Sequence, residues 1–305
     1  MDAILNDRAD LSYSDIPPVI VAATSEAAMR RGLNTIEAAG LRVADRVLVP
    51  SAIERIEKQV STTAIWIELD EDYGGSMDEL LGLISRDVAD GRYAAIVSTC
   101  GGLIDPVMAG LHSGSVEVVV DADEAERAAA LAIATSRAAL PLRLSDVAAD
   151  KGAARLRQLS DEVSRIAATL ARLSTGPMAA PPIEAAPAGD LPPLSAETVR
   201  AVIQARRLRS RYFSEELFAD PAWDMLLDLL QAEIAHLRVP VSSLCIAAAV
   251  PATTALRWLK TMVSEGIFIR RADPHDGRRV FVELAPEASS ALRRYFGEVG
   301  KVAAI

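Results

Sequence analysis

Short runs of β-branched and apolar residues alternate with amphipathic helical patterns over the first 135 residues. Five such runs occupy 17–23, 44–49, 62–69, 93–99 and 116–120, and helical patterns occupy 26–39, 51–60, 77–89 and 124–136. Apolar runs separated by helices predict a parallel sheet covered on both faces. Right-handed crossovers leave an α/β doubly wound five-stranded parallel sheet as the expected fold of a first domain over 1–140.

A strict apolar seam comes after that domain. Its members are spaced by three and four residues in turn, and they are Leu156, Leu159, Val163, Ile166, Leu170 and Leu173. This spacing, flanked by charged residues, predicts a coiled-coil dimerisation helix over 141–175. An amphipathic helix packed on its own domain is the alternative. The next stretch, 176–194, is rich in proline and alanine and is expected to be an extended linker.

The net charge of −10 is unevenly distributed along the chain. Taken whole, it argues against nucleic acid as a partner, because phosphates repel acidic proteins. Residues 1–150 carry −13, however, whereas residues 195–305 carry +2. The last third of the chain is therefore free to meet an anion.

Residues 195–305 read as helices and then a hairpin. A short helix near Ser242, a turn at Val250-Pro251 and a second helix from Ala252 to a stop at Gly266 predict a helix-turn-helix. The second helix is expected to present Thr253, Thr254, Arg257 and Lys260 outward. The next two strands, 266–271 and 278–284, predict a hairpin with a basic tip that holds Arg271, His275, Arg278 and Arg279. These two sets suit a major groove and the adjacent backbone of double-stranded DNA, although a solvated helix face is the simpler alternative.

The run from Leu244 to Ala285, with Asp-Pro-x-Asp-x-Arg at 273–278, resembles the winged helix of the MarR family of transcriptional regulators. The resemblance covers about 220–296. It implies that Thr253, Thr254, Arg257 and Lys260 contact DNA from the recognition helix and that Arg278 is the wing arginine, oriented by Asp276. It also implies a homodimer to which the helices at 195–212 and 287–299 contribute. The chain departs from the family at 284–288, where the family often has Leu-Thr and a glycine.

The first domain resembles the flavodoxin-like receiver of response regulators, with Asp70 after the third strand as its phosphoacceptor. A receiver also needs an acidic pair after strand one and a lysine after strand five. Here the first of these positions holds Ala23-Thr24-Ser25-Glu26, and the second holds Asp121-Ala122-Asp123-Glu124. Both Mg²⁺ binding and neutralisation of a phosphoryl group would be weak without them. We therefore expect a degenerate receiver in which Asp70 is a surface carboxylate, and phosphotransfer is the alternative.

Other kinds of site have little support in the sequence. Two cysteines and three histidines predict no metal site, and neither a phosphate-binding loop nor another cofactor motif is present. No apolar run reaches the roughly 18 residues that span a membrane, and the acidic N-terminus is unlike a signal peptide, so we expect a cytoplasmic protein. The expected function is a non-enzymatic, homodimeric DNA-binding transcription regulator whose first domain meets a signalling protein. The alternatives are a protein-interaction adaptor, a phosphoacceptor regulator that uses Asp70, and a regulator with a small-molecule inducer.

Overall fold

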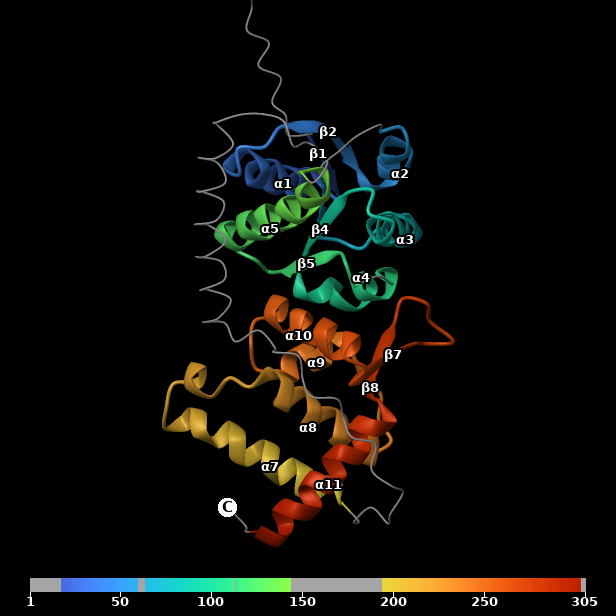
Figure 1. The fold of residues 1–305 in the computed structure, drawn as a ribbon. Coiled ribbons are helices and arrows are strands. Elements are labelled where there is room, and N and C mark those ends of the chain that lie inside the picture. The colour runs from blue at the N-terminus through green and yellow to red at the C-terminus, as the bar shows by residue number, and fades with distance from the viewer. Residues whose placement is uncertain (1–17, 60–63, 113, 144–193, 303–305) are drawn as a thin grey trace, which may run out of the picture.

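The computed structural model describes residues 18–59, 64–112, 114–143 and 194–302, which form two stacked units (Figure 1). The N-terminal unit is an α/β unit, and the C-terminal unit is a winged-helix unit. Residues 144–193 lie outside the described residues, and they include the whole apolar seam, all of the predicted coiled coil except 141–143, which end helix α5 (Glu124–Arg143), and nearly all of the predicted linker. The predicted domain boundaries fall in or beside this segment and stay predictions.

The α/β unit is a five-stranded parallel sheet with strand order β2-β1-β3-β4-β5. This is the flavodoxin-like order, and it confirms the predicted doubly wound sheet. The strands are β1 (Val19–Ala23), β2 (Val43–Leu48), β3 (Ala64–Leu69), β4 (Ala94–Thr99) and β5 (Glu117–Val120). The helices are α1 (Glu26–Ala38), α2 (Val49–Glu57), α3 (Gly75–Ala89), α4 (Ile104–Gly110) and α5 (Glu124–Arg143). Helix α4 was not predicted from the sequence.

Each face of the sheet packs against its own set of helices. Val19, Val21 and Trp66 pack with α1 and α5 on one face. Ile20 and Ile65, their neighbours along the same strands, pack with α2, α3 and α4 on the other. Because β1 and β3 are covered on both sides, they read as continuous apolar runs and not as alternating ones. In this order β5 is an edge strand, so one side of its backbone lacks a neighbouring strand.

The winged-helix unit contains the predicted helix-turn-helix and hairpin. Its helices are α7 (Ala196–Leu208), α8 (Pro221–Ile234), α9 (Val241–Ala247), α10 (Ala252–Ser264) and α11 (Pro286–Val302). Strands β6 (Val239–Pro240), β8 (Val280–Leu284) and β7 (Phe268–Ala272) form an antiparallel sheet in that order. Helices α9 and α10 meet at 109°, within the range of roughly 90–120° for helix-turn-helix motifs. Gly266 ends the second helix with a φ of +69°, a left-handed conformation that favours glycine.

The starts of two further helices are set by local sequence. Ser195 caps α7, since its hydroxyl accepts a hydrogen bond from the backbone N–H of Thr198. Asp220 caps α8 in the same way, with Pro221 at the first helical position.

No single helix in the described ranges is long and apolar enough to cross a membrane. The pair α9 and α10 reaches that length and hydropathy only together, across its sharp bend.

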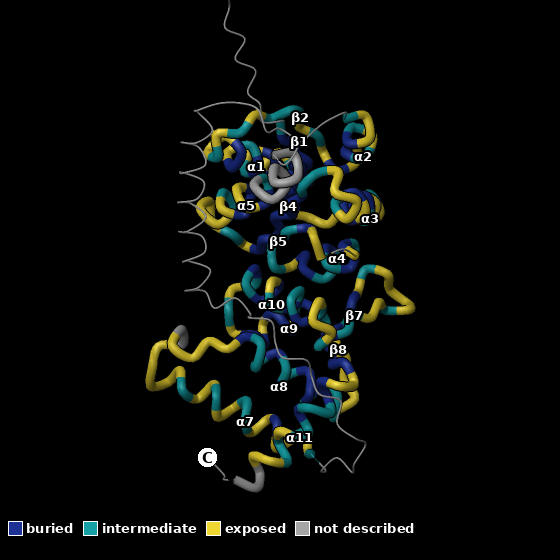
Figure 2. Tube along the Cα trace, in the orientation of Figure 1, coloured by how far each residue is buried: buried dark blue, intermediate teal, exposed yellow. Residues whose placement is uncertain are grey.

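The two units share one buried apolar cluster. It continues from the α2–α4 side of the sheet through β5 into α9, α10 and β7, and Figure 2 shows buried residues on both sides of this contact. Helix α10 lies along β5, and α9 packs on α4 (Figure 1). The helix expected to enter DNA therefore lies against the edge of the sheet in the same chain.

Candidate nucleic-acid interface

Thr253 lies at the centre of the contact between the two units. Its hydroxyl accepts a hydrogen bond from the backbone N–H of Val120 at 2.8 Å and lies 3.3 Å from the carbonyl oxygen of the same residue, to which it donates. One threonine thus binds both the N–H and the carbonyl of Val120 on the open side of the edge strand. The expectation that Thr253 faces solvent is wrong, because the residue is buried against β5.

Arg257 lies one turn further along α10 and forms an ion pair with the α/β unit. Its Nη2 is 2.6 Å and its Nε 2.8 Å from Oε1 of Glu117 on β5. About half of the Arg257 side chain is exposed, whereas Glu117 is mostly covered. The guanidinium that was expected to meet phosphate or guanine therefore meets a carboxylate.

Two other predicted contacts on α10 lie at the rim of this interface. The side chain of Lys260 lies against the loop before β5. A Cβ built onto Gly114 of this loop would be 3.4 Å from Cε of Lys260. Thr254 is half-buried. The face of α10 that the sequence assigned to DNA is thus the face that meets the α/β unit, with Thr253 at its centre.

The wing contacts the α/β unit through Arg278. Its Nη2 is 2.5 Å from Asp72, which precedes α3, and its Nε is 3.2 Å from Asp78 on α3. The hydrogen bond from Arg278, and then the one from the backbone N–H of Gly74, hold the pKa of Asp72 below its usual value. The hydrogen bond to Asp72 contributes most to a raised pKa of Arg278. Both partners are therefore ionised at neutral pH.

Asp276 does not orient the Arg278 side chain as the resemblance implied. Its carboxylate accepts a hydrogen bond from the backbone N–H of Arg278 and lies 3.6 Å from the Arg279 guanidinium. Arg271, His275 and Arg279 are exposed on the hairpin, and Arg271 pairs with Glu283 on the neighbouring strand. These three predicted residues stay on the wing, away from the carboxylates that hold Arg278.

Two contacts of this interface were not predicted. Asp105 on α4 accepts hydrogen bonds from the backbone N–H of Ser242 at 3.0 Å and from its hydroxyl at 2.5 Å. Arg270 on β7 donates to the carbonyl oxygens of Leu111, at 3.1 Å, and of Met108. Those carbonyls belong to the last turn of α4, where a cation is favoured by the helix dipole. Each contact depends on one side chain that meets a distant part of the chain, and no motif or spacing in the sequence marks such a pair.

Burial of Arg270 lowers the pKa of its guanidinium from the usual value. No carboxylate in the described part of the chain pairs with it. Ordinarily a buried cation has an anionic partner, because removing an ion from water is costly unless it is paired.

Asp70 lies in a separate polar cluster at the carboxyl end of β3. It accepts hydrogen bonds from the hydroxyls of Thr24 and Ser25, each at 2.7 Å, and from Arg31 at 3.1 Å. Burial raises the pKa of Asp70, but these hydrogen bonds outweigh it and leave the pKa below its usual value. Glu68, which is buried beside it, pairs with Arg31 and also accepts from Trp66. Both carboxylate oxygens of Asp70, the candidate degenerate phosphoacceptor, thus accept hydrogen bonds from side chains of the same unit.

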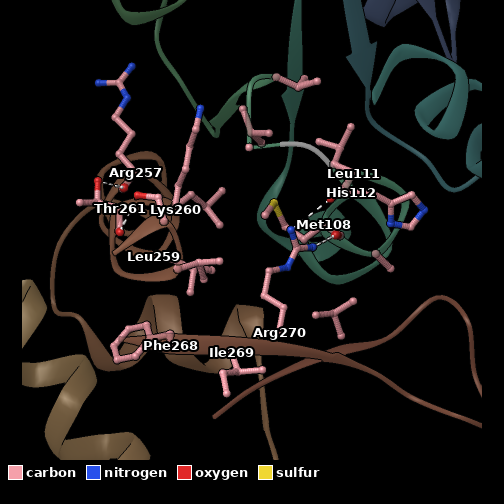
Figure 3. Close-up of a pocket in the computed structure, with 18 of the residues that line it drawn as sticks. Met108, Leu111, His112, Arg257, Leu259, Lys260, Thr261, Phe268, Ile269 and Arg270 are labelled. Atoms are coloured by element: carbon pink, nitrogen blue, oxygen red, sulfur yellow. Dashed lines mark hydrogen bonds between the residues drawn. The ribbon is translucent and has the colours of Figure 1, made fainter. Parts of the chain in front are cut away.

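A cavity of about 920 Å³ opens between the two units beside these contacts (Figure 3). One wall comes from α4 and the segment leading into β5, and the other comes from α10, β7 and the wing. Both Arg257 and Arg270 line it. Within the described residues, no group of three or more His, Cys, Asp or Glu side chains is placed to hold a metal ion.

No protein-family model matches the chain, and no curated protein matches it. An uncharacterized protein from Neptuniibacter caesariensis is similar in structure at 10% identity and a TM-score of 0.35, covering 44% of this chain and 97% of that one.

Two regulators are similar over about a third of the chain. The transcriptional regulator Tm0710 from Thermotoga maritima has 19% identity and a TM-score of 0.22, covering 35% of this chain and 75% of its own. Adhesin competence repressor (AdcR) from Streptococcus pyogenes has 14% identity and a TM-score of 0.22, covering 36% and 79%. All three TM-scores lie below 0.5, so the fold described above rests on this chain's own elements.

Proposed function

We propose that this protein is a double-stranded-DNA-binding transcription regulator and that the described conformation excludes DNA. The observation that carries the proposal is the double use of one surface. The recognition-helix and wing residues that suit DNA, namely Thr253, Arg257 and Arg278, are the residues that bind the α/β unit. They cannot contact both partners at once.

The surface of the α/β unit that contacts the winged-helix unit presents negative charges, as the DNA backbone does. Glu117, Asp72 and Asp78 present carboxylates to the two arginines, as phosphates would. Residues 1–150 carry −13, so the field of this unit attracts the basic face of the winged helix and repels DNA. The negative net charge of the chain then comes from the unit that competes with DNA for the winged helix. It is therefore compatible with DNA binding by the winged-helix unit itself.

The further parts of the proposal rest on sequence patterns. The apolar seam from Leu156 to Leu173 supports a homodimer, and two copies of the winged helix would bind a roughly two-fold operator. Exposed apolar side chains between α7 and α8, such as Tyr212, Phe213 and Leu217, support further contacts between copies. The α/β unit would receive a signal from a protein partner, because Asp70 is already held by Thr24, Ser25 and Arg31.

A second candidate function is a protein-interaction adaptor in which the two units never separate. The apolar cluster that runs continuously from the sheet into α10 favours it. In that case the basic face of α10 exists only to hold the α/β unit. The two functions predict different DNA affinities once the interface is weakened.

The Arg257–Glu117 ion pair provides the test, because it can be broken from either unit. Glu117→Gln removes the carboxylate that competes with DNA for Arg257. It is expected to raise DNA affinity by up to about fivefold, because a partly exposed ion pair contributes at most about 1 kcal/mol. Arg257→Gln breaks the same pair but also removes a DNA contact, and is expected to lower affinity by about tenfold or more. Fluorescence anisotropy with an operator selected from random duplexes measures both.

Two exposed residues outside the interface serve as charge-matched controls. Glu37→Gln and Arg30→Gln, both on α1, change the net charge by the same amounts as the test variants. Opposite shifts for Glu117→Gln and Arg257→Gln, each larger than its control, support the regulator. If neither the unmodified chain nor Glu117→Gln binds DNA, the adaptor is the better description.

A further inference from the structure

The cavity between the two units has apolar walls and a cationic end. Leu256, Leu259 and Val263 on α10 form one wall, and Leu111 and Val116 of the α/β unit form the opposite one. Its volume of about 920 Å³ lies in the range of roughly 300–1,000 Å³ found for small-molecule sites. Arg270 extends from β7 toward Met108 and Leu111 at one end of this space (Figure 3).

The charge balance of the lining is positive. Arg257 and Glu117 both line the cavity and neutralise each other. Arg270 donates two of the five N–H groups of a guanidinium to carbonyl oxygens, which carry no full negative charge. Three N–H groups remain for an acceptor, and the described residues place no carboxylate against them. A planar anion would supply the missing countercharge.

We propose that this cavity binds an amphipathic monocarboxylate, with its apolar body between α10 and the segment before β5 and its carboxylate on Arg270. The fork of a guanidinium matches the two oxygens of a carboxylate, and the apolar walls select a ligand with a hydrocarbon or aromatic body. A small polar anion would leave these walls unfilled.

The direction of regulation is set by where the walls come from. Both units contribute to the site, so the complete site exists only while α10 lies against β5. A ligand that binds one conformation better than another shifts the population toward it. The carboxylate therefore stabilises the closed arrangement and weakens DNA binding. This last step rests on the proposed function, whereas the binding site itself does not.

The experiment uses the full chain with decanoate as the probe and 1-decanol as its uncharged counterpart, measured by isothermal titration calorimetry below the aggregation concentration. We expect one decanoate per chain, bound at least about tenfold more tightly than decanol, as befits a hydrogen-bonded charge pair. Equal affinity for the two probes would overturn the proposal without any variant.

Neighbouring arginines on β7 give the matched variants. Arg270→Gln is expected to weaken decanoate binding by about tenfold or more, while Arg270→Lys keeps the charge and loses less. Arg271→Gln removes the same charge from the adjacent residue, which faces Glu283 outside the cavity, and leaves binding unchanged. Equal losses in Arg270→Gln and Arg271→Gln would show that decanoate does not bind at Arg270.

A DNA-binding readout separates the carboxylate site from the proposed function. Decanoate is expected to weaken operator binding by the unmodified chain and not by Arg270→Gln. Stronger operator binding in decanoate would overturn the closed-state assignment. If the chain binds decanoate through Arg270 but never binds DNA, the proposed function fails and the site stands. Operator binding without decanoate binding refutes the site alone.

Discussion

Neutralising the two carboxylates that hold the wing should release it for DNA. Arg278 forms ion pairs with Asp72 and Asp78, and each of the three side chains is about one-third exposed. Pairs this exposed contribute about 0.2–1 kcal/mol each, so the double variant Asp72→Asn/Asp78→Asn should weaken the closed arrangement by about 0.5–2 kcal/mol. If the closed arrangement dominates, this loss appears as about 2- to 30-fold tighter DNA binding, since 1.4 kcal/mol is a factor of ten.

The assay is a titration of a fluorescent operator with the full chain at two salt concentrations. Removing two acidic charges also lessens general repulsion of DNA, and this effect has to be subtracted. Glu71→Gln/Glu79→Gln is the matched control, because these exposed carboxylates are adjacent in sequence to Asp72 and Asp78, and within the described structure the wing's Arg278 pairs with the two aspartates and not with them. If the Asp double variant binds the operator no more tightly than this control, the wing is not held away from DNA by these ion pairs.

The remaining predictions concern the wing, the packing and one partly buried carboxyl. In the Asp72→Asn/Asp78→Asn background, Arg278→Ala should weaken operator binding about tenfold, measured by the same anisotropy titration, since the residue then has only DNA as a partner. Gly110→Ala should cost about 1–3 kcal/mol in urea unfolding, because the added Cβ would lie 2.8 Å from Cβ of Leu81, whereas Gly82→Ala meets no atom within 4 Å and should not destabilise. Burial raises the pKa of Asp228, with Arg207 offsetting it only partly, so its ionised form opposes folding at neutral pH. Asp228→Asn should therefore raise Tm at pH 7, and this gain should vanish below about pH 4, where the unfolded carboxyl is also protonated.

Periodicity in the sequence was sufficient to predict most of the fold. The five apolar runs and their helices gave the doubly wound sheet, and the turn at Val250-Pro251 with the stop at Gly266 gave the helix-turn-helix. Helix α4 was missed because it is only seven residues long and contains Pro106. This helix contacts the winged-helix unit through Asp105 and through the carbonyl oxygens at its end.

The use of the basic face could not be read from the same patterns. An arginine spaced for phosphate is equally well spaced for a carboxylate, and the sequence does not say which of the two lies opposite Arg257. Thr253 was assigned to the outer face because the helical pattern ignores a sheet edge brought from more than 130 residues away. The missing lysine and acidic pair predicted a weak phosphate site at Asp70, which stays a prediction, and nothing local indicated that Arg31 would pair with this carboxylate.

If α10 binds both DNA and β5, as proposed, this double use also constrains how the chain can evolve. Arg257 meets a side chain, so a change there can be compensated by a change at Glu117. Thr253 meets the backbone of Val120, whose N–H and carbonyl are present with any side chain except proline. Among descendants of this sequence, positions 117 and 257 should therefore covary in charge, while position 253 should keep a hydroxyl. New operator preferences would then arise at Thr254 and on the wing before they arise at the centre of the helix.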